Sequence, residues 1–186
     1  LRKSGFEAYV VGGSIRDIIM NREASDFDIA TSALPNQIAS VFPKAKPYGN
    51  FGTMLVIAEG TKVEITPFRD DAPGRKPNYT FGGSIYTDLA RRDFTINSIA
   101  YDPIKDELID PFGGVEDIKQ GIIRCTGSTV RIWEDPLRAM RAARFQAQLS
   151  FKIESSTFYT LKAHAEKLNT ISKERIRDEL IKLITG

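Results

Sequence analysis

The sequence is poor in the side chains that carry nucleophilic and zinc chemistry. Among 186 residues there is one cysteine, Cys125, and one histidine, His164. A single cysteine excludes an intramolecular disulfide framework and a thiolate metal cluster. A single histidine removes His-based triads and His-ligated zinc from consideration. We therefore expect a cytoplasmic protein whose metal site, if it has one, uses the oxygen ligands that favour Mg²⁺, Ca²⁺ or Mn²⁺.

Long apolar runs and a strong net charge are also missing. The longest apolar runs, such as residues 54–58, are far too short to span a bilayer, so we expect no membrane partner. The formal net charge of +2 is too small to indicate nucleic-acid binding by itself. A local basic strip does occur between residues 130 and 144, and it suits phosphate or nucleic acid.

The predicted secondary structure changes near residue 127. Before it, apolar segments bounded by glycine predict strands, and a pair of them is joined by a tight turn as a hairpin. The predicted strands cover 6–12, 26–30, 51–60 and 62–68, the predicted helices cover 14–21 and 89–102, and short strands and turns cover 105–127. After it, three segments with few helix breakers predict helices at 132–149, 154–168 and 172–184. We expect an α+β fold, with a mixed sheet and flanking helices in residues 1–127 and an all-helical part in 128–186.

A double glycine follows the first predicted strand. A strand that ends in Gly12-Gly13 and continues as a helix directs backbone N–H groups outward, where they can bind an anion. Arg16 would lie within one turn of that anion. The alternative is an ordinary strand-to-helix turn.

Two aspartates follow at i and i+2, in the segment "DFDIA". Alternation along a strand places Asp26 and Asp28 on the same face, where two carboxylates repel each other unless a cation lies between them. Two Mg²⁺ ions held there would activate a hydroxyl and neutralise a leaving pyrophosphate. Glu64, on a neighbouring predicted strand, is a candidate third carboxylate. A solvated strand edge is the alternative.

Two further segments concentrate polar groups. In "RRDFTINSIAYD", Arg92 can bind a phosphate through two N–H groups, while Asp93 and Asn97 could meet a ribose hydroxyl. Salt bridges on a helix surface are the alternative.

In "EDPLRAMRAARF", one acid and three arginines are spaced three residues apart, which places them in a slanting row along a helix. These residues are Asp135, Arg138, Arg141 and Arg144. Asp135 and Arg138 could read the edge of a nucleobase, with the other two facing phosphates. Alternatively, Asp135 only caps the helix.

Five motifs, in order, carry a resemblance to a known family: "GGSIRD", "DFDIAT", "RRDFTINSIAYD", "EDPLRAMRAARF" and "SKERIRDEL". Together they resemble the class II tRNA nucleotidyltransferases and bacterial poly(A) polymerases, across nearly the whole chain. The resemblance implies a polymerase-β-like nucleotidyltransferase head in residues 1–127 and a helical neck in 128–186. The tRNA-binding body and tail of the family are expected beyond Gly186.

The resemblance also implies roles for particular residues. Asp26 and Asp28 would be the catalytic ligands of two Mg²⁺ ions. The incoming nucleotide would be bound by Gly13, Arg16, Arg92, Asp135, Arg138, Arg141 and Arg144. Among these, Asp135 and Arg138 would pair with the base of CTP or ATP in place of a nucleic-acid template.

The implied reaction is attack by the 3′-hydroxyl of tRNA on the α-phosphate of CTP or ATP, with release of pyrophosphate. The segment after the Glu64 strand is shorter than is typical of poly(A) polymerases of this type but still contains "DDAPGRKP", which favours full CCA addition. CC addition, A addition and poly(A) synthesis stay open, as does the oligomeric state. The alternative from another class is a nucleotide-binding regulatory module that has lost its chemistry.

Overall fold

The computed structural model describes residues 1–24, 26–49, 51–71, 79–129 and 131–185. The prediction of full CCA addition rested on residues 70–77, and of these 72–77 lie outside the described part. Within the described part, no helix is both long enough and apolar enough to cross a membrane.

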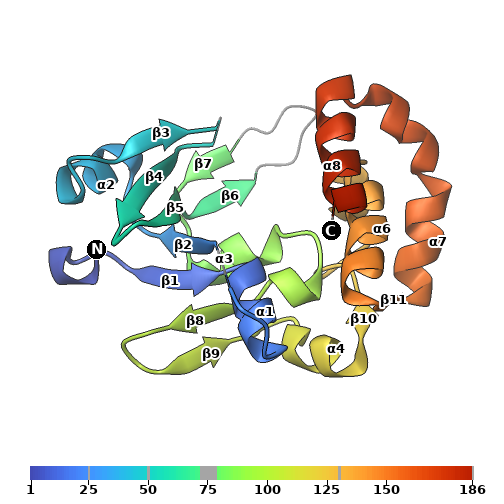
Figure 1. Cartoon of the computed structure of the whole chain (residues 1–186), viewed down its shortest axis with the longest axis horizontal. Coiled ribbons are helices and arrows are strands. Elements are labelled where there is room, and N and C mark those ends of the chain that lie inside the picture. The colour runs from blue at the N-terminus through green and yellow to red at the C-terminus, as the bar shows by residue number, and fades with distance from the viewer. Residues whose placement is uncertain (25, 50, 72–78, 130, 186) are drawn as a thin grey trace.

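A seven-stranded sheet forms one end of the molecule, with strand order β3-β4-β5-β2-β1-β8-β9 (Figure 1). Its strands are β1 (Ala8–Val11), β2 (Phe27–Thr31), β3 (Lys46–Tyr48), β4 (Thr53–Ala58), β5 (Thr61–Pro67), β8 (Ala100–Asp102) and β9 (Glu107–Ile109). Only β2 and β5 run parallel, and the other neighbours are antiparallel. The mixed sheet and the β4–β5 hairpin are thus confirmed. Glu59 and Gly60 turn this hairpin with φ values of 51° and 84°, as a tight two-residue connection requires.

Short helices flank the sheet. They are η1 (Arg2–Ser4), α1 (Gly13–Ile19), α2 (Pro35–Val41), α3 (Ile85–Ala90), the 3₁₀ turn η2 (Thr95–Asn97) and α4 (Gly114–Gln120). A two-stranded sheet of β6 (Arg69–Asp71) and β7 (Tyr79–Phe81) lies beside α3.

The C-terminal segment is helical but contains a strand. Its helices are α5 (Arg131–Glu134), α6 (Arg138–Leu149), α7 (Ser155–Ala163), η3 (Ala165–Thr170) and α8 (Lys173–Thr185). Between α6 and α7, β11 (Lys152–Ile153) pairs in parallel with β10 (Ile122–Ile123). The prediction of an all-helical part is therefore wrong at this point, because Lys152 and Ile153 find strand partners from before the predicted boundary.

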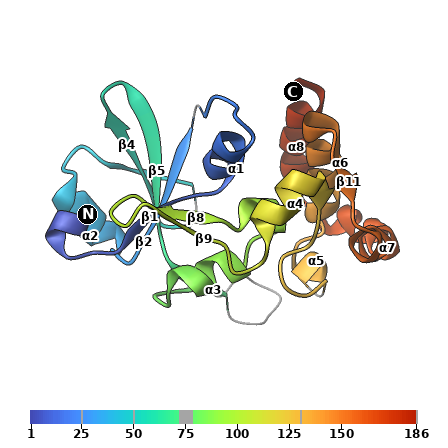
Figure 2. The ribbon, with the colours of Figure 1, turned by 90° about the horizontal axis from the view of Figure 1, so that it is seen from below.

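A hydrophobic cluster connects the two parts of the chain. It joins Ile15 of α1 and Ile118 of α4 to Phe145 of α6 and Leu161 of α7. Both views place α1 and α4 between the sheet and the C-terminal helices (Figures 1 and 2). The expected division after residue 127 stays a prediction, and the cluster indicates that the two parts share apolar packing.

Two local predictions are wrong. Residues 89–102 are not one helix but the end of α3, the turn η2 and strand β8. The N–H of Thr95 donates to the carbonyl of Arg124, and Phe94 forms a bridge with Cys125, so contacts with a distant segment replace the helical hydrogen bonds. In 105–127, α4 forms a helix where only strands and turns were expected, and Asp110 accepts the first N–H groups of that helix.

Candidate active site

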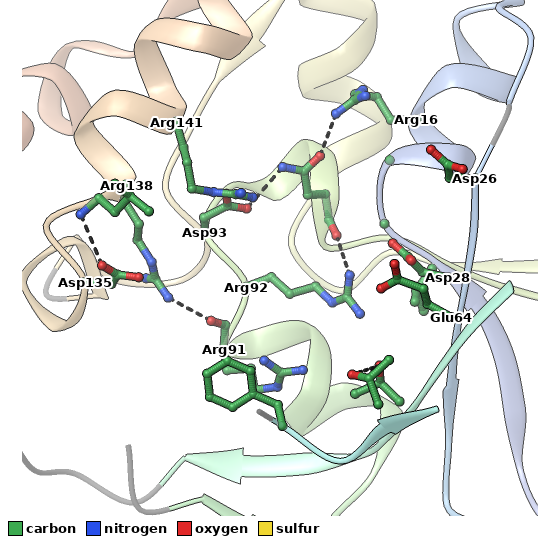
Figure 3. A pocket seen from close by; sticks show the side chains of 18 of the residues that line it. Arg16, Asp26, Asp28, Glu64, Arg91, Arg92, Asp93, Asp135, Arg138 and Arg141 are labelled. Carbon is green, nitrogen blue, oxygen red and sulfur yellow. Dashed lines mark hydrogen bonds and ion pairs between the residues drawn. The ribbon is translucent and has the colours of Figure 1, made fainter. Parts of the chain in front are cut away.

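A cavity of about 720 Å³ lies between one face of the sheet, the α3–η2 segment, and helices α6 and α8. Figure 3 shows its labelled residues converging on one space from both parts of the chain. All the candidate residues named from the sequence line it: Gly13, Arg16, Asp26, Asp28, Glu64, Arg92, Asp135, Arg138, Arg141 and Arg144. The structure therefore brings together residues that are up to 131 positions apart in the chain, from Gly13 to Arg144.

The glycine turn lies at the carboxylate end of this cavity. Gly12 precedes α1 with φ 81° and ψ −145°, a conformation that is essentially restricted to glycine. A Cβ atom on Gly12 would lie 3.0 Å from Oδ2 of Asp28 and 3.4 Å from Nη1 of Arg92. The turn thus leaves room for both side chains. Arg16, one turn into α1, is 9% exposed and lines the cavity.

The three candidate carboxylates come from β2 and β5. Asp28 and Glu64 are directly paired across these parallel strands, and Asp26 lies just before β2. Burial raises the pKa of Asp28; the charge of Arg92 opposes this rise and that of Asp26 adds to it. Burial also raises the pKa of Glu64, and the charges of Asp28 and Asp26 raise it further. The carboxylates therefore repel each other, and a bound cation would relieve the repulsion.

These carboxylates suit a divalent metal ion whose ligands come partly from the protein and partly from a substrate. Among the described residues, no three histidine, cysteine, aspartate or glutamate side chains are grouped closely enough to hold a metal ion by themselves. Mg²⁺ is commonly held by one or two carboxylates, with substrate phosphates and water completing its coordination. Asp26 and Asp28 fit this arrangement, with Glu64 beside them.

Arg92 is oriented by a buried carboxylate. Its Nη2 donates to Oδ2 of Asp88 at 3.0 Å, and Nη2 of Arg91 donates to Oδ1 of the same residue at 2.7 Å. Burial by itself would raise the pKa of Asp88, but the charges of Arg92 and Arg91 hold it below its ordinary value. Within the described residues, Nε of Arg92 is buried without a hydrogen-bond partner. Arg92 thus faces the cavity with donor capacity that the chain leaves unused.

A chain of polar contacts crosses the cavity wall from α1 to α6, as the dashed lines of Figure 3 show. Nη1 of Arg16 donates to Oδ1 of Asn97 at 2.9 Å, and Nδ2 of Asn97 donates to Oδ1 of Asp93 at 3.1 Å. Oδ2 of Asp93 accepts from Nε of Arg141 at 2.7 Å. In this structure, Asp93 and Asn97 thus join the glycine turn to the arginine row.

Asp135 lies in the turn before α6, and not on the helix itself as the three-residue spacing predicted. Pro136 follows it, and α6 begins at Arg138. Oδ1 of Asp135 accepts the N–H of Leu137 at 3.1 Å within this turn, but the N-cap residue of α6 is Leu137 and has no side-chain capping hydrogen bond, so the capping alternative is not confirmed. Oδ2 accepts from Nη2 of Arg175 at 2.6 Å. Nη2 of Arg138 donates to the carbonyl of Arg91 at 3.0 Å, which joins α6 to the end of α3.

Arg144 is more enclosed than Arg141, with side chains 12% and 33% exposed. It forms an ion pair with Glu179 of α8, with side chains 12% and 5% exposed, and its Cζ lies 4.2 Å from the ring centroid of Phe145. The guanidinium groups of Arg16 and Arg141 also lie over this ring, at 5.3 and 5.4 Å. Phe145, a member of the hydrophobic cluster, therefore also supports three cavity arginines.

The sequence analysis missed several residues that line the cavity. They are Phe51, Thr53, Thr66, Arg69, Arg175 and Lys182. Helical phase could have indicated Arg175 and Lys182, because they are seven residues apart and so lie on one face of α8. The aromatic between glycines in "YGNFGT" could have indicated Phe51. No local pattern places β6 beside the site.

The sequence is similar to known protein families and enzymes. The family model described as "Poly A polymerase head domain" matches residues 8–124, and the one described as "Probable RNA and SrmB- binding site of polymerase A" matches residues 150–186. A CCA-adding enzyme of Geobacillus thermodenitrificans is 45% identical over 192 aligned positions, covering 100% of this chain and 47% of the relative. One from Lactobacillus helveticus is 44% identical and is covered over 48% of its length. The chain thus spans about half the length of these curated relatives.

Solved structures show the same similarity. A Bacillus stearothermophilus CCA-adding enzyme in complex with CTP aligns with TM-score 0.93 and 42% identity, over 100% of this chain and 46% of that one. A Thermotoga maritima CCA-adding enzyme complexed with tRNA aligns with TM-score 0.79 and 32% identity, over 98% of this chain and 44% of that one. The nucleotidyltransferase head fold is thereby shared. The chain belongs to the family of the poly(A) polymerase head domain, which includes the CCA-adding enzymes.

Proposed function

We propose that this chain forms the catalytic head and the nucleotide-reading neck of a tRNA nucleotidyltransferase. The enzyme adds C and A residues from CTP and ATP to the 3′ end of tRNA and releases pyrophosphate. The proposed division is a head in residues 1–127 and a neck in 128–186. A cytoplasmic location is proposed with it, since tRNA is the substrate and the chain has a single cysteine.

One observation carries the proposal: a single cavity is lined both by paired carboxylates and by an aspartate and an arginine that suit the edge of a base. Asp28 and Glu64 are held side by side on the sheet, and Asp135 and Arg138 line the same space from the α6 side. Carboxylates beside a phosphate-binding turn suit phosphoryl transfer, which depends on positioning and charge neutralisation. The relatives named above, with CTP or tRNA bound, support the same function.

Enzymes of this family generally use divalent metals, and we propose two Mg²⁺ ions here. Asp26 and Asp28 would hold them, and the bound metal would lower the pKa of the attacking hydroxyl and neutralise charge on the pyrophosphate. In the reaction, the 3′-oxygen of the acceptor forms a bond to the α-phosphorus. The bond from that phosphorus to the β-phosphate oxygen breaks, and the hydroxyl proton passes to water.

The remaining residues of the chain bind and orient the nucleotide. Gly13 and Arg16 at the start of α1, together with Arg92, would contact the phosphates through N–H donors. Asp135 accepts hydrogen bonds and Arg138 donates them, so together they match the amino group and the ring acceptor on the edge of cytosine or adenine. Arg141 and Arg144 would extend the positive surface beside them.

The test is nucleotide incorporation onto a tRNA that ends at its discriminator base, using the natural gene product that contains this chain. CTP and ATP are offered separately and together with Mg²⁺. Three added residues establish CCA addition, two C residues make it a CC-adding enzyme, and an A added only to a tRNA ending in CC makes it an A-adding enzyme. A long A tract indicates a poly(A) polymerase.

Two variants make the result specific to the site. Asp26→Asn combined with Asp28→Asn removes both charges at nearly constant size and should abolish incorporation. Asp178→Asn removes an exposed aspartate of α8, whose side chain is 57% exposed, and should leave incorporation unchanged. Binding of CTP and ATP without any incorporation by the unmodified protein would refute the enzyme and favour a nucleotide-binding regulatory module.

A further inference from the structure

An aromatic side chain with no role in the reaction described so far lines the cavity. Phe51 is 42% exposed, and Cζ of Arg69 lies 4.6 Å from the centroid of its ring. An isolated exposed apolar side chain is ordinary. This one lies in a cavity whose other walls are mostly charged and carries a guanidinium on its face. An aromatic ring beside an arginine is a common way to stack a nucleobase.

The backbone next to Phe51 packs closely against neighbouring side chains. Phe51 lies in the connection between β3 and β4, and Gly52 follows it with φ 73°. A Cβ atom on Gly52 would lie 2.5 Å from Cζ of Phe81 and 3.2 Å from Cγ of Pro35. Gly52, next to Phe51 in the chain, therefore packs closely on β7 and on the start of α2.

The sheet connects this ring to the carboxylates. Glu64 and Thr66 are two residues apart on β5, so their side chains lie on the same face. Oγ1 of Thr66 lies 2.9 Å from Oγ1 of Thr53, which begins β4 two residues after Phe51. A row of cavity-lining side chains thus leads along the sheet from Asp28 and Glu64, through Thr66 and Thr53, towards Phe51.

We infer that Phe51 and Arg69 form a stacking site for an unpaired base at the 3′ end of the RNA acceptor, an inference that rests on the proposed function. The base of the incoming nucleotide is assigned to Asp135 and Arg138. The 3′-hydroxyl of the acceptor must reach Asp28, so the last bases of the acceptor must contact a different wall of the cavity. Stacking tolerates any base, because every base has a π face. Such a site suits an acceptor whose last base changes as residues are added.

The experiment compares Phe51→Leu, which keeps an apolar side chain but removes the ring, with the unmodified protein. KM is measured separately for the acceptor RNA, for CTP and for ATP. Loss of one stacked base should raise KM for the acceptor by about 5- to 150-fold. KM for CTP and ATP should stay within about twofold, because both are bound elsewhere.

Two variants control for indirect effects. Tyr48→Leu alters an aromatic of the same region that is 52% exposed but is not among the residues lining the cavity, and it should leave KM for the acceptor unchanged. Phe51→Tyr keeps an aromatic ring and should restore the KM of the unmodified protein. A loss in Phe51→Tyr as large as that in Phe51→Leu would overturn the assignment.

The acceptor supplies a second, independent readout. Acceptors are prepared with an abasic nucleotide at the last position or at the one before it. At the stacked position, Phe51→Leu should cause no further increase in KM, since there is no base left to lose. A penalty that persists with both abasic acceptors, or an effect on KM for CTP or ATP alone, would refute the inference.

Failure of the inference can be distinguished from failure of the proposed function. Equilibrium binding of a short single-stranded RNA, measured by fluorescence anisotropy without nucleotide, needs no catalysis. If the unmodified protein incorporates nothing but binds this RNA more tightly than Phe51→Leu does, the function fails and the stacking site stands. If both proteins incorporate nucleotides and have equal RNA affinity and equal KM for the acceptor, the stacking site fails and the proposed function stands.

Discussion

The carboxylate of Asp93 makes the most consequential polar contact between the α3–η2 segment and α6. Its Oδ2 lies 2.6 Å from Nη2 of Arg141, and its Oδ1 accepts the N–H of Phe94 at 2.8 Å and Nδ2 of Asn97 at 3.1 Å. Replacing it by asparagine keeps the shape and one acceptor but removes the charge. The substitution therefore tests how much the ion pair contributes to stability.

The expected magnitude follows from burial. Removing one partner of a buried ion pair costs about 3–5 kcal/mol. The side chain of Arg141 is 33% exposed, so water can solvate part of the charge left behind. The N–H groups of Phe94 and Asn97 can still donate to an amide oxygen. We therefore expect Asp93→Asn to lower the free energy of unfolding by about 2–3 kcal/mol.

The stability difference between Asp93→Asn and the unmodified protein should also depend on pH in a defined direction. Burial alone would raise the pKa of Asp93, but the charge of Arg141 and hydrogen bonds from Asn97, Arg141 and Phe94 hold it below the ordinary value of 3.8. A depressed native pKa contributes stability above the unfolded-state pKa, and this contribution is lost as the pH falls through the native value. The difference between the two proteins should be full at pH 7 and should shrink below about pH 3.8.

Urea-induced unfolding followed by circular dichroism measures the effect. The control is Asp178→Asn, whose surface pair with Arg177 should contribute less than about 0.5 kcal/mol. A cycle that combines Asp93→Asn with Arg141→Gln should give a coupling energy above about 1 kcal/mol. A loss no larger than that of the control, or a coupling energy near zero, would show that the pair does not hold the segments together.

Two further substitutions test the site and a helix start. Gly12→Ala should lower the free energy of unfolding by about 1–3 kcal/mol and sharply reduce nucleotide incorporation, because its Cβ would press on Asp28. The control is Gly5→Ala, which is also at positive φ but in open space and should leave incorporation unchanged. Melting curves and activity assays measure both effects. Although burial opposes it, hydrogen bonds from two N–H groups of the first turn of α7, first that of Thr157, lower the pKa of Glu154 to about 2. Glu154→Gln should therefore cost about 1 kcal/mol at pH 7, and urea titrations should show this cost vanishing as the pH falls from 4.5 through about 2.

Local patterns predicted the parts of the site that depend on local structure. The alternation around Asp28 and the turn at Gly12-Gly13 depend only on strand geometry and on the conformational freedom of glycine. The arginine spacing correctly predicted one row, because Arg138, Arg141 and Arg144 lie on one helix. Each of these features is specified within about ten residues of sequence.

Contacts between distant segments account for what could not be predicted. Ile96, Ile99 and Ala100 are all fully buried, but they lie on a 3₁₀ turn, in the connection after it and at the start of a strand, instead of on one helix. The spacing i, i+3, i+4 fits a helix equally well, and the bridge from Phe94 to Cys125 decides between them. In the same way, β11 is a strand only because β10 lies beside it.

The ion pairs of the cavity bear on the nucleotide-binding roles predicted for Arg141 and Arg144. Arg141 is paired with Asp93, and Arg144 with Glu179. A guanidinium has five N–H donors, and a pair with one carboxylate uses only one or two of them. The pair also fixes the direction of the remaining donors, so less reorganisation is needed when a phosphate arrives. Structural pairing and nucleotide binding are therefore not exclusive roles for these arginines.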